Sequence, residues 1–256
     1  MRLERREWLL LGAIAVVVII VIGAIGFLGL PSDPGEGRYG YSVSIGTTAR
    51  LDDVTLILPL PSTPDGGPLV DAIRTGQMDA PSGWNLTVVN TDEGPMLGIE
   101  VGVIPAEVHP DGHRYSTYTI GLSVPAPVAI DTRTPHPGEP LLRPRTDQRA
   151  IPCPNRARPG TIEECSRYES RVYAAYEAAA TAEVDIYVVA GGMNDLAGNG
   201  RLTNRYHDRV TVHLDGPQGG WVGGEGFLSM GMGTYTRFDP LWGGSGRSEI
   251  LIPAHP

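Results

Sequence analysis

The sequence predicts a mainly β fold, a β-sandwich-like external domain with one or two short helices, preceded by a single N-terminal transmembrane helix. Two observations predict this fold class. A 23-residue apolar run near the N-terminus contains no charged residue, and the rest of the 256-residue chain consists of short alternating or apolar runs separated by turn residues. The 34 Gly and 23 Pro are scattered between these runs, so they indicate turns.

The apolar run extends from Trp8 to Leu30. At 1.5 Å per residue, a helix of this length spans about 34 Å, which is enough to cross a hydrocarbon core of about 30 Å. A cleaved signal peptide is the alternative, with Ala24-Ile25-Gly26 as its cleavage site, but the apolar core of a signal peptide usually has only about 7 to 15 residues. We therefore expect a retained signal anchor that places residues 8–30 in the lipid bilayer.

The charges beside the anchor predict its orientation. Three Arg lie in the seven residues before it, whereas Arg38 is the one basic residue among the first 15 after it. Because basic residues stay on the cytoplasmic side, residues 1–7 are expected in the cytoplasm and the remainder outside the cell membrane. Residues 31–37 then form a short polar stalk, and residues 38–256 form one external β-rich domain.

The charge composition excludes some partners. The formal net charge is −9, and all 20 basic residues are Arg. An acidic chain does not attract nucleic acid, so we exclude DNA and RNA as partners. The absence of Lys is compatible with a GC-rich genome and also with an acidic, salt-adapted surface, and both fit a halophilic archaeon.

The external domain shows about nine or ten strand signals, at spacings typical of a sandwich. A turn at Asp92–Pro95 joins two of them into a hairpin, and Pro68–Thr75, closed by Gly76, reads as a short helix with Leu69, Ala72 and Ile73 inward. The expected strands lie at residues 39–45, 54–60, 84–90, 96–104, 115–124, 184–190, 210–214, 227–238 and 250–252.

Other segments have a less regular pattern. Residues 125–144 contain six Pro, which indicates an extended surface crossing without a regular place in a sheet. Residues 163–182 fit a helix by Ala and Glu content and a strand by alternation, and both interpretations stay open. Gly191–Gly200 lacks the ordered carboxylates of a calcium loop, so we expect a plain surface loop there.

Two kinds of covalent modification are indicated. Cys153 and Cys165 are the only cysteines, and in an oxidising exterior they are expected to form a disulfide that stabilises the fold by about 3 kcal/mol. Free thiols are the alternative, and a metal site is disfavoured because neither cysteine has a partner at C-x-x-C spacing. Asn85-Leu86-Thr87 is the single N-glycosylation sequon.

No set of residues predicts a catalytic or cofactor site. His109 and His113 are weak metal-ligand candidates, since the Pro-Asp-Gly between them is turn chemistry and exposed turn histidines are the alternative. Neighbouring carboxylates on a strand point to opposite faces, so sequence-adjacent Asp and Glu do not make an acid/base pair. Trp84, Trp221 and Trp242 could form a carbohydrate or protein contact surface, but the three Phe of the chain leave most of the aromatic core to Trp and Tyr.

Several short strings occur together in the external region. They are Leu51-Asp52-Asp53-Val54-Thr55-Leu56 before Leu58-Pro59-Leu60-Pro61, then Gly83-Trp84-Asn85, Thr91-Asp92-Glu93-Gly94-Pro95-Met96-Leu97 and Gly216-Pro217-Gln218-Gly219-Gly220-Trp221. With the acidic, Lys-free composition and the single anchor, the chain resembles uncharacterised membrane-anchored envelope proteins of haloarchaea. The resemblance implies a habitat and a location, and it carries no catalytic residues.

The function expected from these observations is that of a membrane-anchored extracytoplasmic β-domain protein of the cell envelope with a binding or structural role. Its partner would be an envelope protein or a glycan. Two alternatives remain: an accessory subunit of a membrane complex, and a surface hydrolase that uses convergent carboxylates or a His-bound metal.

Overall fold

A computed structural model describes residues 37–63, 66–107, 115–135, 138–154, 163–195, 203–233 and 235. The expected anchor at residues 8–30, the candidates His109 and His113, and the last expected strand at residues 250–252 lie outside the described residues. Within the described residues, no helix has both the length and the apolar character that a membrane crossing requires.

The mainly β fold class is confirmed. Eleven antiparallel strands and one short helix make up the described part, and nine of the strands follow the order β3-β4-β2-β8-β11-β10-β9-β1-β5, with β6 added to β2 and β7 added to β8. The elements are β1 (Gly37–Thr47), β2 (Leu51–Ser62), α2 (Pro68–Arg74), β3 (Asn85–Thr91), β4 (Gly94–Ile104), β5 (Ser116–Pro125), β6 (Leu141–Arg143), β7 (Thr146–Ile151), β8 (Glu164–Glu177), β9 (Glu183–Asp195), β10 (Thr203–Asp215) and β11 (Gln218–Gly233).

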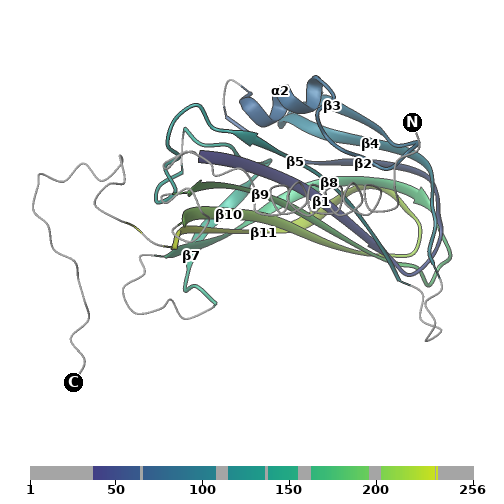
Figure 1. Cartoon of the computed structure of the whole chain (residues 1–256). Helices are drawn as coiled ribbons and strands as arrows, with labels where there is room; N and C mark the ends of the chain where they lie inside the picture. Colours follow the sequence, from purple (N-terminus) through teal and green to yellow (C-terminus); the bar gives the residue numbers. More distant parts are fainter. Residues whose placement is uncertain are drawn as a thin grey trace, which may run out of the picture.

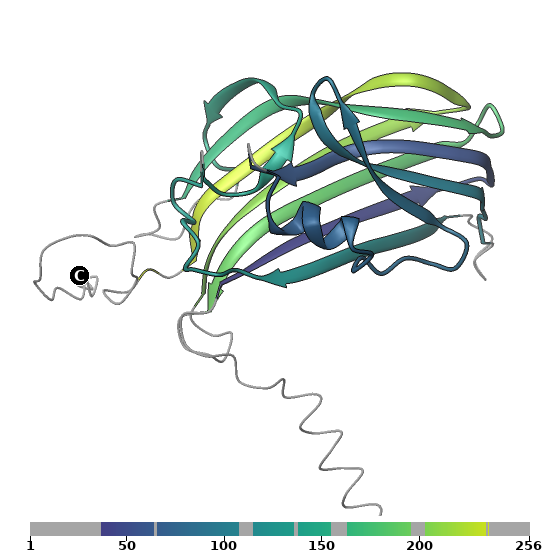
Figure 2. The same ribbon diagram turned by 90° about the horizontal axis from the view of Figure 1, so that it is seen from above.

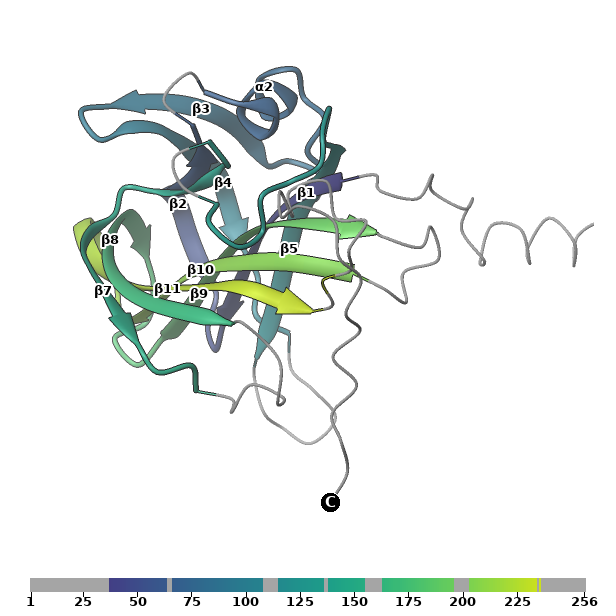
Figure 3. The ribbon, with the colours of Figure 1, turned by 90° about the vertical axis from the view of Figure 1, so that its left-hand side faces the viewer.

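The sheet curls so that its two halves face one another across a common core (Figures 1 and 3). Each strand alternates between the two faces, as in β1, where Tyr39, Tyr41, Val43 and Ile45 are buried and the residues between them are not. The strands are long, and long strands twist, so one sheet can bury its inner face against itself. The expected sandwich of two separate sheets is not confirmed; continuous strand pairing joins all eleven strands.

Helix α2 covers the gap between the two edge strands, β3 and β5. It begins at Pro68, whose missing N–H is not needed in the first turn, and it buries Leu69 and Ile73 against the core, as the sequence predicted. After the helix, Asp79 forms a bridge to Gly121 of β5. Figure 2 shows α2 lying across the strands below it. We call this junction between α2, β3 and β5 the seam.

Most of residues 163–182 form a strand, which settles the alternative that the sequence left open. β8 occupies residues 164–177 and turns its alternate residues, from Tyr168 to Tyr176, into the core. The helix that Ala and Glu favour is overridden, because β8 lies between β11 on one side and β2 and β7 on the other. β9 likewise continues through Asp195 into the region expected to be a surface loop.

The Pro-rich crossing is only partly at the surface, which corrects the expectation of a surface crossing: Val128 is exposed, but other residues are buried. We call residues 126–145 the crossing segment. Ile130, Thr132, Leu141 and Leu142 within it are at most 2% exposed. Proline removes backbone donors that would need partners in a core, and several of the remaining backbone groups bond to side chains on the inner face of the sheet.

Asp208 of β10 is the central side-chain partner of the crossing segment. Its side chain is fully buried and forms an ion pair with Arg145. The backbone N–H of Leu142 donates to Asp208 Oδ2 at 2.8 Å, and the Tyr168 hydroxyl donates to Oδ1 at 2.6 Å. Arg145 also stacks on the Tyr168 ring, 4.4 Å from its centroid. One carboxylate thus joins β8, β10 and the crossing segment.

Polar side chains beside Asp208 hold other points of the same segment. The Tyr206 hydroxyl donates to the carbonyl of Pro140, and the Ser170 hydroxyl donates to that of Pro144. The Asn194 side chain accepts from the N–H of Ile130 and donates to its C=O, each at 2.9 Å. These contacts add to the short pairing of β6 with β2, which is the one strand pairing of the crossing segment among the described residues.

Burial raises the pKa of Asp208, against the opposing effects of Arg145, Tyr168 and the Leu142 N–H. Desolvation of a buried pair offsets much of its attraction, so the pair itself adds little net stability. Removing one partner is different, because it leaves the other charge buried and uncompensated.

Glycine makes room for the two largest side chains of this cluster. Tyr168 lies opposite Gly226 of β11, where a Cβ would meet the tyrosine ring at 2.2 Å. Tyr206 lies opposite Gly192 of β9, where a Cβ would lie 2.5 Å from the ring. Each tyrosine ring therefore packs directly on the backbone of a glycine, and a larger residue at either glycine would displace the ring.

We expect Asp208→Asn to lower the free energy of unfolding by about 3–5 kcal/mol, because the Arg145 cation would stay buried without its counter-charge. Equilibrium denaturation measures this change. Arg167→Gln is the matched control, since Arg167 pairs with Glu225 at 2.9 Å on the exposed face and its loss should change stability by less than about 1 kcal/mol. Equal effects of the two substitutions would contradict this account of the core.

Candidate functional site

The structure places some of the residues singled out from the sequence. Cys153 and Cys165 form the predicted disulfide, with their Cα atoms 5.2 Å apart. Asn85 is exposed at the start of edge strand β3, and its side-chain amide donates to Glu100 at 3.1 Å. That side chain is accessible, and glycosylation at Asn85 stays a prediction. His109 and His113 lie outside the described residues, so a metal site there also stays a prediction.

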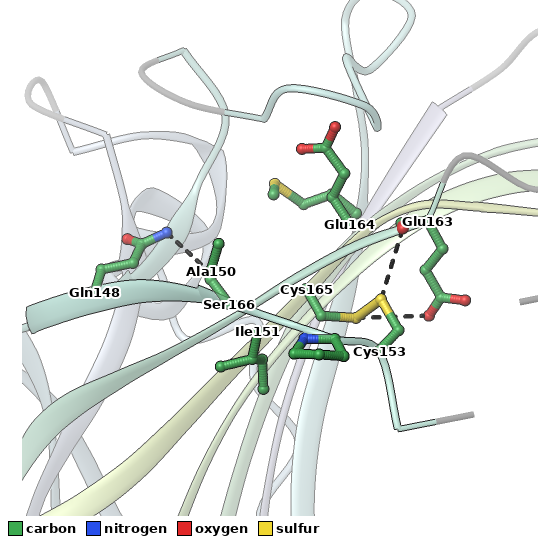
Figure 4. A pocket seen from close by; sticks show the side chains of 10 residues that line it. Gln148, Ala150, Ile151, Cys153, Glu163, Glu164, Cys165 and Ser166 are labelled. Carbon is green, nitrogen blue, oxygen red and sulfur yellow. Dashed lines mark hydrogen bonds between the residues drawn. A yellow bond between two sulfur atoms is a disulfide. The ribbon is translucent and has the colours of Figure 1, made fainter. Parts of the chain in front are cut away.

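A pocket of about 730 Å³ opens beside the disulfide, between β7, the start of β8 and the end of β11. Figure 4 shows that the disulfide and Glu163 form one part of its wall, with Ile151 of β7 near them and Gln148 farther along β7, where it bonds to Ser166. Ser229 of β11 donates to Glu163 Oε1 at 2.8 Å. The lining mixes apolar and polar groups, and sequence reasoning missed it because β7 and β11 are 67 or more residues apart in the chain.

The second surface feature is an aromatic patch on the outer face of the sheet. Trp221 of β11 lies directly opposite Tyr173 of β8, with ring centroids 5.6 Å apart in an edge-to-face arrangement. Arg171, two residues from Tyr173, lies over the Trp221 ring at 5.3 Å from its centroid. We call Arg171, Tyr173, Gly219, Trp221 and Gly223 the Trp221 patch.

Glycines leave the sides of the Trp221 ring uncovered. Gly219 and Gly223 lie two residues before and after Trp221, on the same face of β11, and a Cβ at either position would meet no atom within 4 Å. Trp221 is 42% exposed. A large aromatic ring on the surface of a sheet is normally covered by its neighbours along the strand, so this arrangement keeps an apolar plane available to a ligand.

Charged groups surround the patch. Glu93, in the turn between β3 and β4, lies 3.7 Å from Arg171, and both side chains are largely exposed. The Arg167–Glu225 pair lies on the same face, four residues from Arg171 along β8 and two residues from Gly223 along β11. The patch therefore combines one apolar plane with hydrogen-bonding groups at its border, which suits a ligand that has both apolar and polar surfaces.

The exposure of Trp221 is a difference from the sequence-based expectation that most Trp and Tyr serve the core. The sequence did contain a signal for this exposure. Alternate residues of a strand lie on one face, and residues 219, 221, 223 and 225 are Gly, Trp, Gly and Glu, so one face of the strand carries a single Trp between two glycines. Trp84 is partly buried against the core, and Trp242 lies outside the described residues.

Two histidines on β10 have opposite electrostatic surroundings. Hydrogen bonding of His213 Nδ1 to Asp185, at 2.8 Å, raises the pKa of His213, and Asp215 and Glu183 act in the same direction. Burial lowers the pKa of His207, and the nearby Arg209 and Arg205 lower it further. The stabilisation linked to His213 is therefore present below about pH 6.5 and is lost as the pH rises through its pKa in the folded protein.

The comparisons add no relative. No protein-family model, curated protein or solved structure matches the chain.

We expect His213 to titrate above, and His207 below, the ordinary histidine pKa of about 6.5, because a carboxylate faces the first and burial and two arginines act on the second. The pH dependence of the imidazole NMR signals measures both values. Asp185→Asn should bring the pKa of His213 down and leave His207 unchanged. Titration of both histidines at the same pH would show that these contacts are not formed in solution.

Proposed function

We propose that the chain is a membrane-anchored extracytoplasmic protein of the cell envelope, and that its β domain binds an envelope glycan through the Trp221 patch. The exposed Trp221 between two glycines carries the binding part of the proposal. The apolar run at residues 8–30, the basic residues before it and the acidic composition support the location. The disulfide agrees with an oxidising exterior.

A glycan fits the patch better than a protein does. Protein interfaces of ordinary size need an extended apolar centre of several large side chains. In the described residues the exposed large apolar side chains are spread over several elements, and Trp221 with Tyr173 packed edge to face against it forms one small apolar surface. A sugar ring offers a C–H face of about this size for Trp221, and its hydroxyl groups can bond with Arg171 and Glu93 at the border.

The composition bears on how such binding would work. An acidic, Lys-free surface suits a salt-rich medium, in which the Debye length falls to about 3 Å at 1 M salt. Long-range attraction between charges is then weak. Contact of an apolar ring with a sugar face, together with short hydrogen bonds, persists under these conditions, and the Trp221 patch offers both.

We expect Trp221→Ala to weaken binding to isolated envelope polysaccharide by about 10- to 100-fold, because burial of a large apolar side chain contributes about 1.5–3 kcal/mol. Affinity electrophoresis of the full-length chain in gels containing the polysaccharide measures the change. Tyr187→Ala is the matched control, since Tyr187 is 45% exposed but lies on β9, away from the patch. Unchanged binding by Trp221→Ala, or an equal loss in both variants, would rule out the patch as the glycan site.

The location is tested separately. We expect a protease added to intact cells to digest the domain from residue 38 onward and to leave a short fragment that contains residues 1–30, since the N-terminus is proposed to face the cytoplasm. Antibodies against each end of the chain follow the two products. Full protection of the C-terminal part in intact cells, with digestion after lysis, would reverse the topology.

A further inference from the structure

Three donor side chains meet at one wall of the pocket beside the disulfide. The Sγ atoms of Cys153 and Cys165 and a carboxylate oxygen of Glu163 all lie within 4.8 Å of one another, the one such group of three among the described residues. Cys165 Sγ is 4.0 Å from Glu163 Oε1. Cys153 follows β7 and Cys165 lies at the start of β8, so the group joins two strands (Figure 4).

We propose that the disulfide and a Zn²⁺ ion are alternative occupants of this site, with Cys153, Cys165 and Glu163 as the zinc ligands once the disulfide is reduced. A dithiol reductant supplies two electrons and two protons, so the S–S bond breaks, two thiols form, and the dithiol becomes a disulfide. Zinc then binds the two thiolates, and the two thiol protons pass to the solvent. This site is independent of the proposed glycan-binding function.

The geometry suits a tetrahedral ion. Zinc lies about 2.3 Å from thiolate sulfur and about 2.0–2.2 Å from carboxylate oxygen, so the ligand atoms around it lie within about 4 Å of one another. A carboxylate oxygen of Glu163 already lies at this separation from Cys165 Sγ, 4.0 Å away. The two sulfur atoms must move from a covalent distance of about 2.05 Å to about 3.8 Å, which rotation of the two cysteine side chains provides without a shift of the strands.

The surroundings complete the site. Ser229 donates to Glu163 at 2.8 Å, and a hydrogen bond of this kind orients a ligating carboxylate. The pocket opens next to the three donors and offers space for a water molecule as the fourth ligand. Two sulfur donors and one oxygen donor suit Zn²⁺, which accepts both, better than Mg²⁺ or Ca²⁺, which prefer oxygen alone, or Cu⁺, which prefers sulfur.

The two occupants have the same mechanical effect. Either a disulfide or a zinc ion ties the end of β7 to the start of β8, so the link between these strands can persist when the redox conditions change. The affinity for zinc should fall as the pH falls, because protons compete for both thiolates.

The test uses the full-length chain in detergent micelles. One sample is kept oxidised, and the other is reduced with dithiothreitol and freed of reductant without oxygen. Each is titrated with Zn²⁺ in competition with a coloured chelator, and with Co²⁺, whose bonds to thiolate give a near-ultraviolet absorption band. We expect the reduced chain to bind one Zn²⁺ at least about 100-fold more tightly than the oxidised chain, and to show the cobalt band.

Matched variants separate this site from other metal-binding groups. Glu163→Gln should weaken zinc binding by about tenfold or more, and Ser229→Ala by about tenfold. Glu177→Gln is the control, since Glu177 is an exposed carboxylate at the other end of β8 and does not line the pocket, and it should bind zinc as the unaltered chain does. If reduction unfolds the domain, zinc should restore its far-ultraviolet circular dichroism.

Two results would overturn the proposal. The first is equal zinc affinity of the oxidised and reduced chains, with no recovery of structure on adding zinc. The second is equal affinity of the reduced unaltered chain and its Glu163→Gln variant, which would show that the carboxylate is not a ligand.

Discussion

The burial of one carboxylate, that of Asp208, is the constraint on which much of the core depends. A charge without access to water must be matched by an opposite charge and by hydrogen bonds, and here Arg145, Tyr168 and a backbone N–H of the crossing segment supply them. This requirement fixes where the crossing segment passes. It also explains why parts of a Pro-rich stretch can be buried against the sheet: beyond the short pairing of β6 with β2, polar side chains of β8, β9 and β10 bond with its backbone.

Much of the sheet could be predicted, because alternation along a strand is a local property of the sequence. β1, the β3–β4 hairpin and helix α2 follow their patterns closely. β8 could not be decided, since its Ala and Glu content favours a helix and only the neighbouring strands favour extended backbone. The crossing segment was predicted at the surface because its proline content indicates that it cannot form regular strand pairs. It does not show that Asn194, Tyr206 and Asp208, more than 60 residues away, provide its partners.

The candidate sites differ in the same way. The disulfide was predictable because it depends on only two residues and on the compartment. The other residues of the Trp221 patch and of the pocket beside the disulfide were not predictable, since they come from separate strands. Tyr173 contacts Trp221, and Ser229 contacts Glu163, only because β8 pairs with β11. Glycine content gave an ambiguous signal. On the inner face glycines make room for Tyr168 and Tyr206, and on the outer face they leave Trp221 uncovered, so the same residue type has opposite effects on the two sides of one sheet.

The seam has a consequence for motion. Everywhere else in the order from β3 to β5 neighbouring strands pair through backbone hydrogen bonds. In the described part of the chain the two edges meet instead through a seven-residue helix, one isolated bridge and the contact between Trp84 and Tyr118. Local opening follows the weakest set of contacts. The curled sheet should therefore open locally at the seam while the strands that hold the Asp208 cluster stay closed. Amide hydrogen exchange should then be faster in β3 and β5 than in β8 and β10. Such opening would bring water to the apolar face of α2 without unfolding the domain.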